Sequence, residues 1–268
     1  MKVSVLISIY SKERPDYFKQ ALESIGCAQT VIPDEIVVVQ DGPIGNNLNT
    51  VLIDFKQKYS GILKIVGYST NKGLGYALNY GLKECTHNIV LRMDSDDIAL
   101  NNRIELQKLI FSENPSIDIC GMQIEEFDEN GKTYVRKVPS SKASIIKYSK
   151  IRNPLNHVTV GFKRDKILSL GSYKEMMYFE DYYLWLRCIK NGYNIINIPK
   201  NGVMVRAGVD MIGRRRGIAY IKHEFNFFSI CQKEGLISRF HLIKALIMRI
   251  PPRLLGPYLN LIYTKLLR

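Results

Sequence analysis

The sequence predicts an α/β protein whose core is a mostly parallel sheet covered by helices on both faces. In the first half of the chain, solid apolar runs rich in β-branched residues alternate with amphipathic segments of helical period. This alternation is typical of parallel strands that are buried on both faces. The chain has 268 residues, of which 46% are hydrophobic and 24% charged, so it is large enough to bury a sizeable core.

The elements of the first half follow from these runs. Strands are expected at Val3 to Ile9, Glu35 to Val39, Ile62 to Tyr68 and Asn88 to Met93. The helices between them are expected to open at Arg14-Pro15-Asp16, to run through Leu48, Leu52 and Phe55, and to span about Leu74 to Cys85. Each helix separates two strands, as a parallel sheet requires.

The pattern changes after about residue 115. Ile117 to Phe127 and Lys132 to Val138 read as antiparallel strands around the turn Asn130-Gly131. The stretch Glu180 to Asn191 predicts a helix that turns Leu184, Trp185, Cys188 and Ile189 inward. Residues 214 to 268 are expected to be helical, with a break at Ile250-Pro251-Pro252.

Polar residues gather where the predicted strands end, which is the edge at which parallel sheets bind their ligands. The stretch RMDSDD, residues 92 to 97, stands out because it places three carboxylates within four positions. Such carboxylates raise one another's pKa unless solvent or a cation balances them. Mg²⁺ or Mn²⁺ prefers oxygen ligands and takes one or two carboxylates together with phosphates of its substrate. The alternative is that Asp96 or Asp97 caps the next helix while the other carboxylates are solvated.

The net charge and the cysteine spacing indicate which partners and which cellular compartment suit the chain. The net charge is +13, and after Glu234 the chain has no acidic residue, while its arginines and lysines interleave with apolar residues. Such a tail suits an anionic surface, either membrane or nucleic acid. The five cysteines are scattered without metal or disulfide spacing, which favours a reducing cytoplasm.

Five segments in order carry a family resemblance: VSVLISIYSKE (3 to 13), VVVQDG (37 to 42), NKGLGYALNYGL (71 to 82), MDSDD (93 to 97) and EDYYLWLR (180 to 187). The chain resembles family 2 of the nucleotide-sugar glycosyltransferases, inverting enzymes of the Rossmann-like GT-A fold. Within that family it is similar to bacterial members that build exopolysaccharide, capsule or amylovoran-type polymers. The resemblance implies a GT-A domain over residues 1–210, with a nucleotide-sugar half (1–98) and an acceptor-side half (99–210) that includes the antiparallel section. Residues 211–268 would form a basic helical extension.

The resemblance also implies a metal-dependent transfer from a nucleotide-sugar, commonly a UDP-sugar, to a glycan or polyprenyl-diphosphate-linked acceptor. It places the donor at Ile9, Tyr10, Glu13, Asp41, Asn71, Gly73 and Asp94. Asp96 would be the principal ligand of Mn²⁺ or Mg²⁺, with Asp94 near both metal and ribose. Asp181, in the pair Glu180-Asp181, would be the general base, and His157 would lie near the acceptor. The chemistry agrees, because the leaving diphosphate needs a cation and the acceptor hydroxyl needs a base.

Other interpretations of these residues stay open on the sequence alone. Asp41 fits a simple turn, Glu180-Asp181 fits favourable charge at a helix N-terminus, and His157 fits a structural role. Arg214-Arg215-Arg216 fits either a solvated run or a site for the diphosphate or an acceptor phosphate. The resemblance implies a metal-binding histidine after the late strand, but this chain has Val205-Arg206-Ala207-Gly208 there.

The tail and the overall function have alternatives too. We expect the tail to lie peripherally on the cytoplasmic membrane leaflet, with Leu254, Leu255, Tyr258 and Ile262 dipping inward. A nucleic-acid-binding protein is the non-enzymatic alternative, but recognised motifs are absent, and no nucleic-acid partner is expected. A sugar nucleotidylyltransferase would need a glycine-rich loop where Ser11-Lys12-Glu13-Arg14 stands. A dinucleotide site at residues 73–78 lacks its third glycine.

Overall fold

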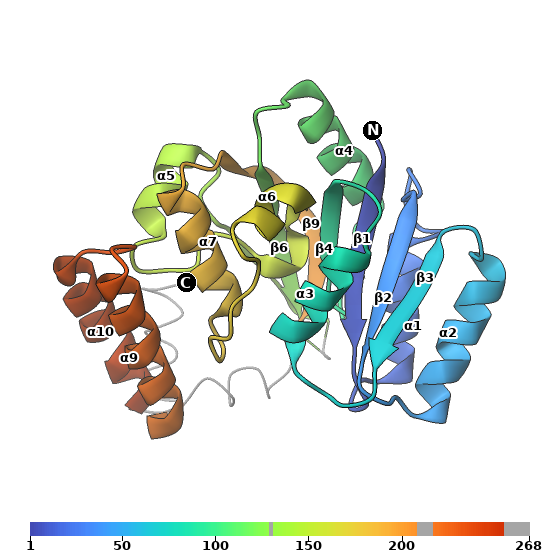
Figure 1. The fold of residues 1–268 in the computed structure, drawn as a ribbon, viewed down its shortest axis with the longest axis horizontal. Coiled ribbons are helices and arrows are strands. Elements are labelled where there is room, and N and C mark those ends of the chain that lie inside the picture. The colour runs from blue at the N-terminus through green and yellow to red at the C-terminus, as the bar shows by residue number, and fades with distance from the viewer. Residues whose placement is uncertain (129–130, 208–216, 255–268) are drawn as a thin grey trace.

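The computed structural model describes residues 1–128, 131–207 and 217–254, and in these residues a single mixed sheet forms the centre of the molecule (Figure 1). The strand order is β3-β2-β1-β4-β8-β6-β9-β5, and β7 pairs with β6. The first four strands are β1 (Val3–Ile9), β2 (Glu35–Asp41), β3 (Leu63–Tyr68) and β4 (Ile89–Met93). All four are parallel, as the sequence predicts.

Alternation along the strands divides the core into two layers. Ile7 of β1 packs with the helices α1 (Pro15–Ile25), α2 (Asn46–Lys58) and α4 (Arg103–Glu113). Its neighbour Leu6 points to the other face, where α3 (Leu74–Glu84) and α7 (Glu180–Lys190) cover the sheet. Because successive side chains of a strand point to opposite faces, a strand covered on both sides is apolar at most of its positions. The three helices predicted between the first four strands are confirmed as α1, α2 and α3.

The second half extends the sheet with antiparallel and parallel neighbours. The predicted hairpin is confirmed, since β6 pairs antiparallel with β7. The elements of this half are β5 (Ile98–Ala99), β6 (Ile119–Phe127), β7 (Thr133–Arg136), α5 (Lys142–Tyr148), η1 (His157–Thr159), β8 (Gly161–Lys163), α6 (Arg164–Ser169) and β9 (Ile195–Arg206). The long β9 runs parallel to β6 and carries the chain back to the end of β4, where β5 pairs with it.

Two C-terminal helices, α9 (Gly217–Lys233) and α10 (Arg239–Leu254), pack against α7 at one end of the molecule (Figure 1). The contact is aromatic: the rings of Phe179 and Phe227 stack with centroids 4.6 Å apart. The predicted break at Ile250-Pro251-Pro252 is wrong, because α10 continues to Leu254. Arg249 and Arg253, on either side of the two prolines, both pair with buried Glu224 of α9 and hold the end of α10 in place.

Candidate functional site

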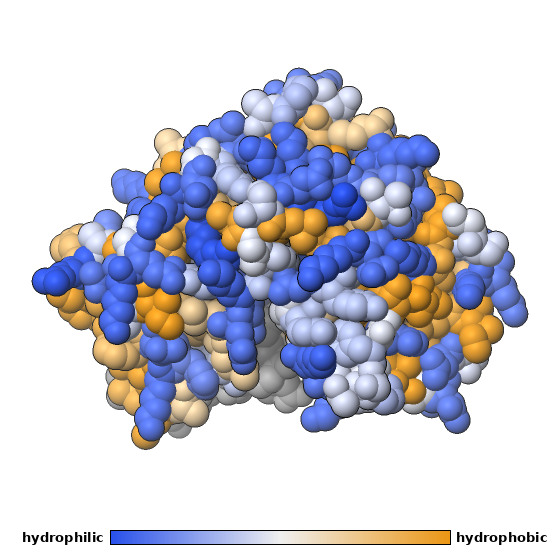
Figure 2. Space-filling model, viewed as in Figure 1, coloured by the Kyte–Doolittle hydropathy of each residue, from blue (hydrophilic) through white to orange (hydrophobic). Residues whose placement is uncertain are grey.

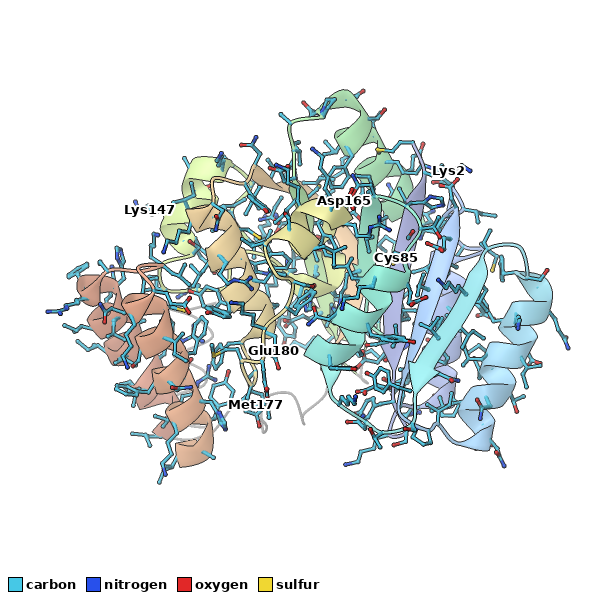
Figure 3. All side chains as sticks on the ribbon, in the orientation of Figure 1. Lys2, Cys85, Lys147, Asp165, Met177 and Glu180 are labelled. Atoms are coloured by element: carbon cyan, nitrogen blue, oxygen red, sulfur yellow. The ribbon has the colours of Figure 1, made fainter. Side chains whose placement is uncertain are left out.

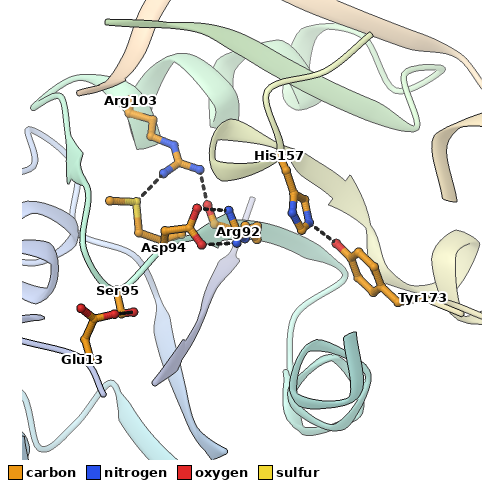
Figure 4. Close-up of polar contacts among 8 residues, drawn as sticks. Glu13, Arg92, Asp94, Ser95, Arg103, His157 and Tyr173 are labelled. Atoms are coloured by element: carbon orange, nitrogen blue, oxygen red, sulfur yellow. Dashed lines mark hydrogen bonds and ion pairs between the residues drawn. The ribbon is translucent and has the colours of Figure 1, made fainter. Parts of the chain in front are cut away.

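The acidic stretch follows β4 and is held by a buried arginine. Arg92 lies in β4 and Asp94 directly follows the strand, and a spacing of two residues in extended backbone turns both side chains to the same face. The guanidinium of Arg92 donates to both carboxylate oxygens of Asp94 (Figure 4). The Arg92 side chain is only 3% exposed, whereas that of Asp94 is 32% exposed. Sequence reasoning gave Arg92 no role, although the spacing of two residues was a usable signal.

The two carboxylates that follow are crowded. Burial and the nearby charges of Asp94 and Glu13 raise the pKa of Asp96 to about 6. Burial, with Asp94 and Asp96 adding to it, raises the pKa of Asp97 well above its usual range. A cation would offset this repulsion. The donor set fits a divalent ion that takes one or two carboxylates and completes its shell with substrate phosphates.

Among the described residues, no group of three or more His, Cys, Asp and Glu side chains is arranged to hold a metal by itself. The end of β9, where the resemblance implies a histidine, instead supplies Arg206. Its backbone N–H donates to Asp97 at 2.9 Å, and its Nε donates to the carbonyl of Asp96 at 2.7 Å. The guanidinium also lies 4.0 Å from the ring centroid of Tyr17. Arg206 therefore fixes the acidic loop from the end of β9.

The segment after β1 contacts the same loop. Ser95 donates its hydroxyl to Glu13 at 2.5 Å (Figure 4). Of the two residues at the end of β1, Ile9 is buried and Tyr10 is exposed. The structure thus brings Glu13 and the acidic loop together, as the strand-end argument predicts, and gives Glu13 a positioning contact.

Asp41, at the end of β2, organises the loop after β3. Its buried carboxylate accepts four hydrogen bonds: from the Tyr68 hydroxyl at 2.8 Å, the Asn71 amide at 3.0 Å, and the backbone N–H groups of Lys72 and Gly73 at 2.7 and 2.9 Å. A carboxylate offers about four acceptor positions, so the protein itself occupies all of them. Asn71 and Gly73, two predicted donor-pocket residues, are positioned by this one side chain.

Gly42 makes the close approach of these two loops feasible. Its φ is +80°, and a Cβ atom there would lie 2.6 Å from the backbone nitrogen of Asn71. An L side chain would be strained in this conformation and would also push the loop away.

The Glu180-Asp181 pair opens α7. Asn153 donates its amide to one oxygen of Asp181 at 2.6 Å, and the Tyr182 N–H donates to the other at 2.7 Å. A helix N-terminus favours negative charge, so this setting suits an ionised Asp181. Glu180 is different: burial raises its pKa, and its side chain packs against Gly75 at the start of α3. Figure 3 shows Glu180 at the base of α7 and Met177 on the loop before it.

His157 contacts Tyr173, which lies on the segment before α7. Its Nε2 lies 2.9 Å from the Tyr173 hydroxyl (Figure 4). Burial, with the charge of Arg92 adding to it, lowers the pKa of His157 well below 6.5, so the ring is neutral at pH 7. Burial raises the pKa of Tyr173, and the charges of both Asp181 and Asp94 contribute to that rise.

Asn79 of α3 is a site residue that sequence reasoning missed. Its amide donates to the carbonyl of Tyr173 at 2.7 Å, and its side-chain oxygen accepts from the Tyr173 N–H at 2.9 Å. The same oxygen accepts from the hydroxyl of Ser172, whose φ is +52°. Asn79 thus fixes the segment that leads to α7. Arg214 and Arg215 lie outside the described residues.

Comparisons with known proteins agree with this architecture. Residues 4–182 match the model of "Glycosyl transferase family 2". The amylovoran biosynthesis glycosyltransferase AmsE of Erwinia amylovora is 44% identical over 227 residues, covering 85% of this chain and 84% of AmsE. The UDP-Gal:alpha-D-GlcNAc-diphosphoundecaprenol beta-1,3-galactosyltransferase of Escherichia coli is 40% identical, covering 100% of this chain and 97% of that protein.

Solved structures share the fold at low sequence identity. The mannosyltransferase PcManGT of Pyrobaculum calidifontis, in complex with GDP-Man and Mn²⁺, superposes with a TM-score of 0.69 at 16% identity, covering 92% of this chain and 70% of that one. Residues 1–349 of S. aureus TarS, in complex with UDP-GlcNAc, give 0.67 at 19% identity, covering 100% and 76%. The chain therefore belongs to glycosyl transferase family 2, and its GT-A fold is confirmed. Membership favours a glycosyltransferase over the nucleotidylyltransferase and non-enzymatic alternatives.

Proposed function

We propose that the chain transfers a sugar, with inversion, from a UDP-sugar to a glycan carried on a polyprenyl diphosphate during assembly of a cell-surface polysaccharide. The donor and acceptor classes are those in the name of the Escherichia coli relative, and the polymer class follows the name of the Erwinia amylovora relative. The observation that carries the proposal is a crowded acidic loop at the carboxyl edge of the sheet together with an oriented carboxylate, Asp181, at the start of α7, where its neighbour Glu180 lies against Gly75 of α3.

The donor would lie along the carboxyl edge of β1, β2 and β4. The loop that Asp41 organises, together with Ile9, Tyr10 and Glu13, would form the nucleotide end of the pocket. Asp94 and Asp96 would hold Mn²⁺ or Mg²⁺, which when bound neutralises charge on the departing diphosphate. Asp94 is already paired with Arg92, so Asp96 has the greater share of free acceptor positions.

On the acceptor side, Asp181 would remove the proton from the attacking hydroxyl. The hydrogen bonds from Asn153 to one oxygen and from the Tyr182 N–H to the other restrict rotation of this carboxylate. Direct attack by that hydroxyl, on the face of the sugar opposite the diphosphate, inverts the anomeric centre. Glu180, whose pKa is raised by burial, and neutral His157 would help to position the acceptor next to Asp181.

A membrane-carried acceptor supports a location at the inner face of the cytoplasmic membrane, where the enzyme would act as a peripheral protein. Within residues 1–128, 131–207 and 217–254, no helix is both long and apolar enough to cross a bilayer. The tail residues Leu255, Tyr258 and Ile262, expected at the lipid interface, lie outside the described residues.

A transfer assay tests the proposed function. The full-length protein is incubated with Mn²⁺, a panel of UDP-sugars and a synthetic polyprenyl-diphosphate-linked N-acetylglucosamine, and the product is analysed by mass spectrometry and NMR. We expect the acceptor mass to increase by one sugar, with the anomeric configuration opposite to that of the donor. Retention of configuration would overturn the inverting mechanism. Activity only with donors of another nucleotide would overturn the UDP assignment.

A further inference from the structure

The outward face of α10 is apolar. Phe240, Ile243 and Ile247 are 69%, 57% and 68% exposed, and Leu254 follows at 58%. Spacings of three, four and seven residues place these side chains on one side of an α-helix. Ala245, on the opposite side, is fully buried against the aromatic cluster between α10, α9 and α7. In the space-filling view, this corner of the molecule shows hydrophobic residues between hydrophilic ones (Figure 2).

The charges around this face have one sign. Arg239 and Lys244 are exposed, and the helical period places them on either side of the apolar face. α10 contains no acidic residue, and the single acidic residue of α9, Glu224, is fully buried and paired with Arg249 and Arg253. The described surface of the two helices therefore presents apolar and basic groups without carboxylates.

The same helix pair contacts the loop that leads to the proposed base. The ring of Tyr178, on the loop before Glu180, lies 5.1 Å from that of Tyr220 on α9, centroid to centroid. Met177 and Tyr178 are 56% and 50% exposed. Exposed apolar side chains thus occur both on α10 and beside the entrance to α7. A surface bound at α10 would bring a membrane-carried acceptor to the Asp181 side of the site.

We propose that the exposed face of α10, formed by Phe240, Ile243, Ile247 and Leu254 and flanked by Arg239 and Lys244, binds the surface of an anionic lipid bilayer. An apolar helix face bordered by basic side chains is the pattern of interfacial helices, in which the apolar groups enter the headgroup boundary and the cations meet anionic lipid. The inference rests on the proposed function only for its purpose, since lipid binding can be measured without transfer.

Vesicle binding by the full-length protein tests the proposal. Vesicles of phosphatidylglycerol and phosphatidylcholine are titrated at low salt, and bound protein is separated by flotation. The triple variant Phe240→Ser/Ile243→Asn/Ile247→Asn is expected to bind about tenfold or more weakly, because three apolar side chains no longer leave water. The matched control replaces three comparably exposed apolar residues outside the two C-terminal helices, Ile32→Asn/Ile53→Asn/Leu109→Asn, and is expected to bind like the wild type.

A charge variant separates the electrostatic contribution. Arg239→Gln/Lys244→Gln should weaken binding to anionic vesicles by about fivefold per charge at low salt and leave binding to neutral vesicles unchanged. All substituted side chains are exposed, so equal thermal unfolding and equal UDP binding should show that the fold and the donor site are intact.

Wild-type binding that the α10 triple variant retains would overturn the proposal, as would failure of the wild type to bind anionic vesicles. A wild-type dimer that becomes a monomer in the triple variant, without vesicle binding, would assign the face to a second copy of the chain and also overturn it. Loss of vesicle binding in the triple variant, in a protein that transfers no sugar, would support the docking face while the proposed function failed.

Discussion

Replacing Asp41 with asparagine should loosen the loop after β3 before it changes anything else at the donor site. The carboxylate accepts two hydrogen bonds at each oxygen: from Tyr68 and Lys72 at one, and from Asn71 and Gly73 at the other. An asparagine amide keeps one oxygen and puts an NH₂ group where the other was. Two of the four protein donors would then face the NH₂ group, which cannot accept a hydrogen bond. The other two donors would keep an oxygen as acceptor, but an uncharged one.

The size of the effect follows from those contacts. Hydrogen bonds to a charged group contribute about 1.5–3 kcal/mol each, so two lost bonds set an upper range of about 3–6 kcal/mol. Asn71 and Lys72 are exposed, and water can replace part of what is lost. We therefore expect the free energy of unfolding of Asp41→Asn to fall by about 2–3 kcal/mol.

Urea unfolding of the wild type, Asp41→Asn and the exposed control Asp54→Asn measures this difference. The control lies on α2, where its side chain is in solvent, and should be unchanged. If Asp41→Asn kept wild-type stability but lost UDP binding, Asp41 would act by direct contact with the base, and the reasoning from its four protein partners would be refuted.

Three further outcomes are expected. In metal-free protein at pH 8, Asp96→Asn should raise the free energy of unfolding, measured in urea, by about 1–3 kcal/mol. The pKa of Asp96 is about 6 in the wild type, because burial and the charge of Asp94 oppose its ionised form. An unchanged or lower free energy of unfolding in the variant would contradict this reasoning. His157 has a lowered pKa, so its native state binds fewer protons than the unfolded chain below pH 6.5 and stability is lost as the pH falls. From pH 7 to pH 5, the free energy of unfolding should therefore fall more in the wild type than in His157→Gln. An equal fall in both proteins would be evidence against a lowered pKa of His157. Asn79→Ala should lower kcat about tenfold or more with the Kd for UDP unchanged, because Tyr173 on the acceptor side loses the two hydrogen bonds that hold its backbone. A kcat like that of the wild type would mean that Asn79 has only a structural role.

The sequence predicts the sheet well because strands buried on both faces are mostly apolar, as the runs Val5-Leu6-Ile7 of β1 and Ile36-Val37-Val38-Val39 of β2 are. It failed at Pro251-Pro252 because local propensity opposes a helix there, whereas the pairing of Arg249 and Arg253 with Glu224 is a tertiary contact across two helices. Such contacts leave no periodic signal in the sequence.

At the site, topology alone places Glu13, Asp41 and the acidic loop on one edge, so these neighbours could be predicted. Their partners could not. The pair of Arg92 with Asp94 could be predicted from their spacing of two residues at the end of β4. The contact of Arg206 with Asp96 joins residues 110 positions apart and depends on how β9 crosses the sheet, which no local pattern encodes.

The steady-state kcat of Asp181→Asn, measured with Mn²⁺ beside the Kd for UDP, tests the central claim most directly. If Asp181 is the general base, kcat should fall by about 10²–10⁴-fold. The Kd for UDP should stay within about twofold, because Asn153 and Tyr182, which donate to Asp181, lie outside the donor loops. Exposed Asp165→Asn should match the wild type. A kcat for Asp181→Asn within tenfold of the wild type would contradict the account and require another base.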